Sequence, residues 1–142
     1  MDVVDQATRS RMMSAIRGKN TQPELKVRRF LHAYGYRFRL HRKDLPGNPD
    51  IVLPQLMTCI FVHGCFWHKH ENCRYAPTPK SRPEFWENKL SKNAERDAKA
   101  SEALQRLGWT VLIVWECQLR DAETTLNGLV EDLRCLENAR QE

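Results

Sequence analysis

Residues 50–73, DIVLPQLMTCIFVHGCFWHKHENC, hold two short apolar runs followed by a dense group of cysteines and histidines. The runs Asp50–Leu53 and Cys59–Val62 have the length and composition of buried strands, and the turn signal Gly47-Asn48-Pro49 precedes the first. Three histidines lie within residues 63–70. This stretch therefore predicts two neighbouring strands that lead into a loop rich in metal-ligating and proton-transferring side chains.

Elements with clear start and stop signals flank this stretch. The predicted helices cover residues 5–17, 21–35, 81–108 and 122–137, and the further strands cover 36–40 and 109–115. Thr21 with Glu24, and Ser81 with Glu84, have the spacing of a capping box, each with a proline in the first turn. The run WTVLIVW at 109–115 is continuously apolar, as expected for a strand buried on both faces. The order predicts an α/β fold, a mixed sheet with helices on both faces.

Composition indicates a soluble, cytoplasmic chain of one domain. The length of 142 residues suits a single core, and no apolar run approaches the roughly 18 residues of a membrane span. The net charge of +5 is unevenly spread, because residues 1–43 carry 11 Lys/Arg against 3 Asp/Glu. This bias fits either solvated basic helices or a surface for a polyanion such as nucleic acid, and composition alone does not choose.

The cysteines favour a metal site over disulfides, because there are five of them and no secretory signal. Four zinc-type ligands lie within nine residues: Cys65, His68, His70 and Cys73. The spacing would let one folded loop present Cys65, His70 and Cys73 together. A structural zinc site normally has four ligands, so the fourth would come from elsewhere, and Cys117 after the apolar run is the best candidate. Each of these residues could instead be a packing residue. Cys59 and Cys135 lie in apolar settings and are predicted to be buried free thiols.

Asp50 is the candidate for a second, harder metal site. It opens an apolar strand that would hold its carboxylate rigidly at the end of the sheet, and Mg²⁺ uses one or two such carboxylates. The following strand would bring His63 to the same end. Glu24 could add a carboxylate or serve only as a helix-capping residue, and Asp50 could be a plain turn residue. Histidines that a zinc site leaves unused, such as His63 and His68, can transfer protons near pH 7.

Two aromatic residues of the loop, Phe66 and Trp67, suggest contact with bases. Exposed aromatic side chains near basic residues can stack on bases or wedge between base steps, whereas core packing is the ordinary alternative. Met13, in the basic first helix, is a weaker candidate for the same role.

Five motifs together resemble one family, the very short patch repair (Vsr) endonucleases, which nick DNA at T:G mismatches. They are ATRSRMMSAIRGKNTQPE (7–24), LPGNPDIVLP (45–54), FVHGCFWHKH (61–70), EFWENKLSKNAERD (84–97) and LGWTVLIVWEC (107–117). The resemblance implies a restriction-endonuclease-like fold with an αβββαβ core and a structural zinc site. It also implies one Vsr-type domain over residues 1–142, with a basic DNA-contacting helix at 1–20 and a nuclease core at 21–142.

The resemblance also implies catalytic roles. Asp50 would hold the catalytic Mg²⁺, helped by the main-chain carbonyl of Val62. His68 would be the general acid/base and His63 a second catalytic histidine. Glu24 would hydrogen-bond water of the metal.

Structural and DNA-binding roles follow from the same resemblance. The zinc ligands would be Cys65, His70, Cys73 and Cys117. The residues that contact DNA would be Met13, Phe66, Trp67, Lys89 and Asn93, with the first three intercalating beside the mismatch.

The implied activity is Mg²⁺-dependent hydrolysis of the phosphodiester 5′ of the thymine in a T:G mismatch, where the thymine derives from deaminated 5-methylcytosine. The implied setting is the nucleoid of a bacterial cytoplasm, with a monomer acting on double-stranded DNA beside a cytosine methyltransferase and mismatch-repair proteins. Two alternatives remain open. One is a nuclease of the same fold that cuts matched DNA. The other is a zinc-stabilised DNA-binding module without catalysis, which would have no use for Asp50 with His63 and His68.

Overall fold

The computed structural model describes residues 21–141, so the predicted first helix and Met13 lie outside the described residues. The elements are α2 (Gln22–Ala33), β1 (Arg39–Leu40), β2 (Ile51–Leu53), η1 (Pro54–Leu56), β3 (Thr58–His63), α3 (Pro83–Arg106), β4 (Thr110–Trp115), η2 (Glu116–Asp121) and α4 (Ala122–Gln141). The four strands form one sheet in the order β1-β2-β3-β4. β3 pairs antiparallel with β2 and parallel with β4, which confirms the predicted mixed sheet.

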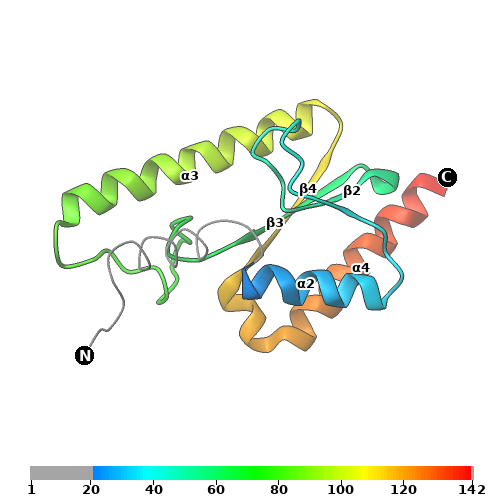
Figure 1. Ribbon diagram of the computed structural model, residues 1–142, viewed down its shortest axis with the longest axis horizontal. Coiled ribbons are helices and arrows are strands. Elements are labelled where there is room, and N and C mark those ends of the chain that lie inside the picture. The colour runs from blue at the N-terminus through cyan, green and yellow to red at the C-terminus, as the bar shows by residue number, and fades with distance from the viewer. Residues whose placement is uncertain (1–20, 142) are drawn as a thin grey trace, which may run out of the picture.

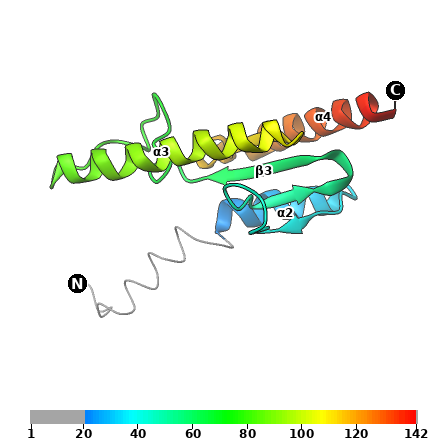
Figure 2. The ribbon, with the colours of Figure 1, turned by 90° about the horizontal axis from the view of Figure 1, so that it is seen from above.

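Helices cover both faces of the sheet, as predicted (Figure 1). Strand residues alternate between the faces because successive side chains of a strand point in opposite directions. Toward α2 and α4 point Ile51, Leu53, Ile60 and Val114, which pack with Val27, Leu31, Leu129 and Leu133. Toward α3 point Val52, Cys59 and Phe61, which pack with Leu104. Figure 2 shows β3 between α3 and α2. No helix among residues 21–141 is long and apolar enough to cross a membrane.

The two predicted capping boxes had different outcomes. The Thr21 hydroxyl accepts a hydrogen bond from the Glu24 backbone N–H at 3.4 Å, so the start of α2 is confirmed. The prediction of Ser81 as the cap of α3 is wrong, because Arg82 occupies the N-cap position and no side chain caps this helix. Pro83 already fills the first helical position, which leaves Ser81 one residue too far from the helix.

The strand predictions needed two corrections. The first strand is two residues long rather than 36–40, since β2, its one partner among residues 21–141, is itself three residues long. The run at 109–115 is not buried on both faces. Within residues 21–141 it forms an edge strand in which Ile113 is 40% exposed and only Val114 is buried. An apolar edge strand has the same composition as a central one, so the sequence could not separate the two.

The two remaining cysteines also differ from each other. Cys59 is completely buried in β3, as predicted. Cys135 is exposed, so the prediction of a buried thiol there is wrong. It lies on the solvent side of α4, whose packed residues, including Leu129 and Leu133, lie on the opposite side.

One end of the sheet gathers the residues singled out from the sequence. β3 and β4 run parallel and end at His63 and Trp115, and the antiparallel β2 begins at that same end, just after Asp50. The turn before Asp50 packs closely on α3, since a side chain at Gly47 would lie 2.6 Å from the Cβ of Ala100. The first half of α3 extends past this end, beside the loop 64–82 (Figure 1).

Candidate functional site

Asp50 is anchored by the backbone of the neighbouring strand. Its Oδ2 accepts a hydrogen bond from the Val62 N–H at 2.8 Å, and its carbonyl accepts one from the His41 N–H at 3.1 Å. Burial raises the pKa of Asp50. The groups that oppose this rise are the Val62 N–H and the nearby charges of His41, His68 and Arg28. A cation placed beside this carboxylate would therefore be strongly favoured.

Glu24 completes a second acidic position next to Asp50. Its side chain is 1% exposed, and it binds Arg28 one helical turn later and His41 Nε2 at 2.9 and 3.0 Å. Ligand atoms of Glu24, His41 and Asp50 lie within 4.8 Å of one another. Glu24 therefore lies next to Asp50, and its backbone N–H also donates the hydrogen bond by which the Thr21 hydroxyl caps α2.

This acidic group fits a hard divalent cation. Asp50 Oδ1 accepts no hydrogen bond from any residue in the described range, so one carboxylate oxygen remains to ligate a metal. One or two carboxylates, with water and substrate phosphate completing the shell, are the usual protein ligands of Mg²⁺. Sequence reasoning had missed His41 and Arg28. The i,i+4 spacing of Glu24 and Arg28 is a signal that could have identified Arg28. His41 reaches the site through a backbone turn in which its φ is 49°, and no sequence pattern predicts that turn.

His63 and His68 form a stacked pair. Their rings are parallel within 2°, with centroids 3.8 Å apart. His68 Nδ1 lies 2.6 Å from Oδ2 of Asp97 on α3. Sequence reasoning had also missed Asp97, although it lies one turn after Asn93 on the same helix face. This contact with the carboxylate fixes the orientation of the His68 ring.

His63 differs from its neighbour in burial and charge. It is 4% exposed, and its Nδ1 has no hydrogen-bond partner among the described residues. Burial, reinforced by the charge of His68 and opposed by Asp97, lowers the pKa of His63 to about 4. His63 is therefore neutral near pH 7 and packs against His68, which leaves His68 as the accessible imidazole.

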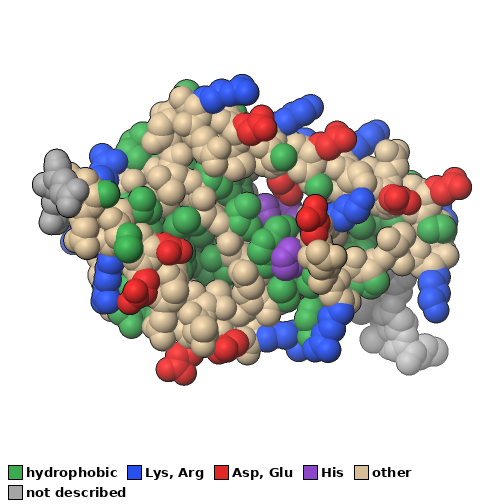
Figure 3. Space-filling model, turned by 180° about the vertical axis from the view of Figure 1, so that it is seen from behind, with side chains coloured by type: hydrophobic (Ala, Val, Ile, Leu, Met, Phe, Trp, Pro, Cys, Tyr) green, Lys and Arg blue, Asp and Glu red, His purple; other side chains and the backbone are tan. Residues whose placement is uncertain are grey.

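The histidine pair opens into a cavity of about 550 Å³. Its walls include His63, His68 and Asp97, together with Ile113 and Trp115 of the exposed face of β4. Figure 3 shows histidine side chains within a hollow on the face opposite to that of Figure 1. The imidazole of His68 is thus reachable by a ligand from solvent.

A second group of ligands contains no carboxylate. One ligand atom each of Cys65, His70, Cys73 and Cys117 lies within 4.8 Å of the others. Cys117 Sγ lies 3.5 Å from His70 Nδ1, and the Cys117 N–H donates to Cys65 Sγ at 3.3 Å. Tetrahedral zinc, with Zn–S of about 2.3 Å, holds its ligand atoms less than about 4 Å apart. The donor set therefore fits a closed zinc-type site after small movements, and we call it the Cys/His cluster.

The loop conformation decides which histidine joins the Cys/His cluster. The His68 N–H donates to Gly64 O at 3.1 Å, the His70 N–H donates to Cys65 O at 3.0 Å, and Lys69 between them has a φ of 50°. His68 points toward Asp97, whereas His70 stacks on the Trp115 ring at 4.0 Å and reaches Cys117. The structure therefore places His70 with the cysteines and His68 with the carboxylates.

Phe66 and Trp67 belong to a larger aromatic group. Their ring centroids are 5.0 Å apart, and both lie within about 6 Å of Trp86 in the first turn of α3. Phe85 adjoins Trp86 at 5.4 Å and is 44% exposed. Sequence reasoning missed Phe85 and Trp86, because their contact with the loop depends on how α3 crosses it. The half-buried rings form an aromatic surface beside the histidine pair.

Lys89 and Asn93 contact this surface. Lys89 Nζ lies 6.0 Å from the ring centroids of both Phe85 and Trp86. The Asn93 amide donates to Trp67 O at 3.1 Å, which holds the loop against α3. The two predicted DNA-binding residues therefore lie beside the aromatic residues, with Asn93 already engaged by the protein.

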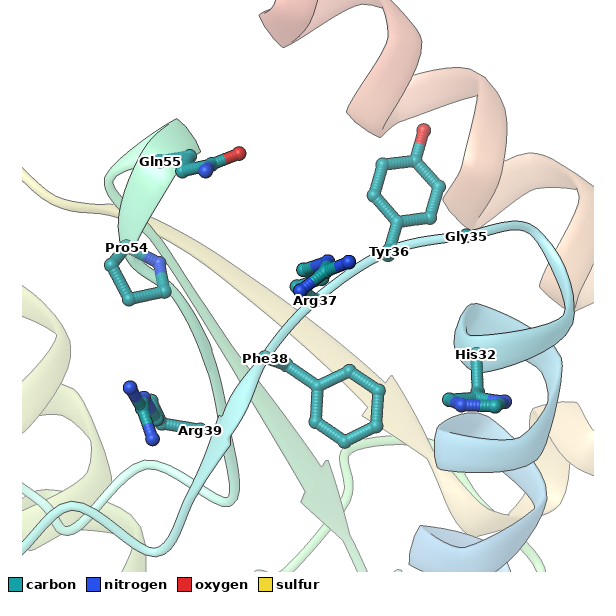
Figure 4. A pocket seen from close by; sticks show the side chains of 8 residues that line it. All are labelled: His32, Gly35, Tyr36, Arg37, Phe38, Arg39, Pro54 and Gln55. Atoms are coloured by element: carbon teal, nitrogen blue, oxygen red, sulfur yellow. The ribbon is translucent and has the colours of Figure 1, made fainter.

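A further cavity, of about 760 Å³, lies at the other end of the sheet (Figure 4). It is lined by His32, Gly35, Tyr36, Arg37, Phe38, Arg39, Pro54 and Gln55. Pro54 follows the last residue of β2, whereas Asp50 precedes the first. No described lining residue is a carboxylate, so this cavity does not offer the ligands of a catalytic Mg²⁺.

A mixed sheet with an αβββαβ order, carboxylates and imidazoles at one end, and a separate Cys/His cluster is consistent with an α/β nuclease. Comparison with known proteins agrees. Residues 1–74 match the family described as DNA mismatch endonuclease Vsr. The chain is 48% identical over 122 residues to the DNA mismatch endonuclease Vsr of Escherichia coli K12, which covers 86% of this chain and 78% of that protein.

Other similar proteins are described as nicking enzymes. The type II nicking enzyme V.XorIIP of Xanthomonas oryzae pv. oryzae is 54% identical over 110 residues, covering 78% of this chain and 80% of that protein. The type II nicking enzyme V.NmeAIP of Neisseria meningitidis is 41% identical over 136 residues, covering 94% and 96%. The chain therefore belongs to the Vsr family of DNA mismatch endonucleases, and it is a DNA-acting hydrolase. These relatives do not favour the alternative of a DNA-binding module without catalysis.

Proposed function

We propose that this protein nicks one strand of double-stranded DNA by hydrolysing the phosphodiester 5′ of the thymine in a T:G mismatch. The observation that carries the proposal is the location of two groups at one end of the sheet. Asp50, with Glu24 next to it, is bound by the backbone of Val62 just before His63 and is near enough to feel the charge of His68. The loop that carries His68 also presents Phe66. Reactive groups and an aromatic surface that can engage bases therefore occupy neighbouring positions.

Asp50 and the main-chain carbonyl of Val62 would hold Mg²⁺, with Glu24 close enough to contact its water shell. When bound, Mg²⁺ supplies Lewis-acid stabilisation of the charge that develops on the phosphoryl oxygens. The chain itself fixes the carboxylate, because the Val62 N–H restrains one oxygen of Asp50 and leaves the other available.

His68 is proposed as the general acid/base. Its Nδ1 is hydrogen-bonded to Asp97, so Nε2 is left to accept or donate a proton. His63 stacks on the His68 ring and limits its rotation. Because burial keeps His63 neutral near pH 7, it supports His68 without adding a competing charge.

Phe66 and Trp67, with Met13 from outside the described residues, are proposed to insert beside the mismatch. Inserting a ring costs a few kcal/mol of unstacking per step, and a mispair is already easier to open. Asn93 supports the Trp67 backbone, and Lys89 carries positive charge at the edge of the aromatic surface. This arrangement favours a mismatched over a matched duplex.

The Cys/His cluster is proposed to hold a structural Zn²⁺. It joins the loop 64–73 to Cys117 after β4 and so fixes the position of the segment that carries Phe66, Trp67 and His68. The metal would contribute to folding and not to the chemical step.

The proposed biological role is repair of thymine formed by deamination of 5-methylcytosine. The protein would act as a monomer on nucleoid DNA in a bacterial cytoplasm, alongside a cytosine methyltransferase and mismatch-repair proteins.

The test is nicking of end-labelled duplexes that differ only in one base pair. We expect cleavage 5′ of the thymine in the T:G duplex when Mg²⁺ is present, and little cleavage of the T:A and C:G duplexes. Equal cleavage of matched and mismatched duplexes would instead support the alternative of a nuclease for matched DNA. Repeating the assay with varied flanking bases then defines the sequence context.

A further inference from the structure

Two arginines from distant segments share one tyrosine ring. The guanidinium carbon of Arg74 lies 4.9 Å from the ring centroid of Tyr75, and that of Arg120 lies 4.1 Å away. Arg74 Nη2 also donates to the Tyr75 hydroxyl at 2.6 Å. Arg74 and Tyr75 lie in the loop before α3, whereas Arg120 lies in η2. We call this group the arginine–tyrosine clamp.

The clamp carries unneutralised positive charge. Within residues 21–141, neither Arg74 nor Arg120 forms an ion pair with a carboxylate, and both side chains are exposed. Acidic residues close in sequence, such as Glu71 and Asp121, leave both guanidinium groups unpaired. Two like charges held near one ring repel each other, and an anion bound between them would relieve that repulsion.

The chemistry of the two side chains favours phosphate. A guanidinium presents a planar set of N–H donors that matches phosphate oxygens, and stacking on an aromatic ring orients that plane in advance. Only part of the donor set of Arg74 is used by the Tyr75 hydroxyl. Within residues 21–141, the other donors of Arg74 and all those of Arg120 have no hydrogen-bond partner, so they can bind an anion.

The position of the clamp ties it to the nuclease end of the sheet. Arg74 directly follows Cys73, and Arg120 lies three residues after Cys117, so both arginines flank members of the Cys/His cluster. That cluster lies where β3 and β4 end, which is also the end that carries His63 and Asp50. A DNA duplex engaged at the histidine pair extends beyond the reacting bond and presents further backbone phosphates.

We propose that Arg74 and Arg120, oriented by Tyr75, bind a backbone phosphate of the DNA substrate outside the scissile bond. This contact adds affinity without reading sequence, because phosphate contacts position a protein on DNA and carry no base information. The clamp therefore acts alike on matched and mismatched DNA, which makes it independent of the proposed T:G specificity.

The test measures binding to one matched and one T:G duplex over a range of NaCl concentrations, without Mg²⁺ so that no strand is cut. The variants are R74A, R120A and the double variant. The matched control is R37A/R39A, which removes two exposed arginines at the opposite end of the sheet (Figure 4). Each protein's thermal unfolding midpoint is recorded alongside.

The double variant is expected to bind both duplexes about tenfold more weakly, with the salt slope reduced by about 0.9 for one lost phosphate contact. Because the two arginines share a phosphate, each single variant should show most of this loss of affinity. Y75L, which keeps both charges but removes the ring, should show a smaller loss of affinity. The proposal is overturned if the double variant binds like the control, even when its unfolding midpoint falls, because the clamp would then be purely structural.

Discussion

The Cys/His cluster and the acidic group around Asp50 draw on the same short stretch of chain but differ in donor chemistry. Three thiols and one imidazole make up the first, and its ligand atoms converge in one place. The second combines the carboxylates of Asp50 and Glu24 with His41, and Asp50 is near enough to feel the charge of His68, which lines an open cavity. Soft donors in a closed set suit a structural metal, whereas hard donors beside a cavity suit chemistry.

The difference shows how one loop serves both purposes. Between Gly64 and His70 the backbone turns back on itself, so neighbouring residues of the sequence point to different sites. If the two sites have separate tasks, a substitution in the acidic group should lower the rate of nicking and leave zinc content and stability unchanged. A substitution in the Cys/His cluster should lower zinc content and stability. The predictions below test that separation.

The largest expected effect is from D50N. Without the charged carboxylate we expect nicking of a T:G duplex to fall by at least about 1000-fold, which corresponds to about 4 kcal/mol of transition-state stabilisation. The unfolding midpoint and zinc content should stay unchanged. D44N, which alters an exposed carboxylate paired with Arg42, is the control and should keep full activity. Near-normal nicking by D50N would remove Asp50 from the catalytic role.

The complementary change is C117S in the Cys/His cluster. We expect loss of bound zinc and a destabilisation of more than about 3 kcal/mol, because the loop 64–73 loses its tie to η2. That corresponds to a fall in the unfolding midpoint of about 10 °C. C135S, at an exposed cysteine outside the cluster, should retain zinc and stability. Zinc bound normally by C117S would contradict the assignment of this ligand.

At the His63–His68 pair, H68A should lower the rate of nicking at saturating DNA by about 100-fold or more, because the proposed general acid/base is removed. D97N should lower it by about tenfold, because a neutral amide is a weaker acceptor than a carboxylate for the His68 ring N–H and holds the ring less firmly. Both variants should bind the T:G duplex as wild type does. A rate in D97N equal to that of wild type would show that this carboxylate does not position His68 for the reaction.

The smallest effect is expected for H63F. A phenyl ring can replace a neutral imidazole that stacks on His68, so the rate should stay within about threefold of wild type. H63A removes the stacking surface and should lower the rate by about tenfold, since His68 is then less restrained. A large loss in H63F, equal to that in H63A, would instead mean that His63 acts through its nitrogen atoms.

Local signals predicted much of the fold. The Thr21 cap, the apolar run before His63 and the spacing of α3 each depend on neighbours in sequence, and each element formed. The exposed face of β4 and the short β1 were mispredicted, because strand composition does not tell which strand lies at the edge of a sheet.

The candidate site divides in the same way. Asp50, Glu24 and the loop ligands stand in recognisable local patterns, so the sequence identified them and the structure brings them into two groups. Asp97 and His41 carry no such pattern. They reach the site only because α3 crosses the loop and the chain turns after β1, which are tertiary facts.

The separation of the two proposed metal sites is tested most directly by measuring zinc content and T:G nicking on the same sample. The sample is first dialysed against a chelator too weak to remove zinc from a closed site. We predict about one zinc per chain throughout, no nicking after dialysis, and full nicking once Mg²⁺ is added. Full nicking without added Mg²⁺, or full activity from a chain that holds no zinc, would contradict the account.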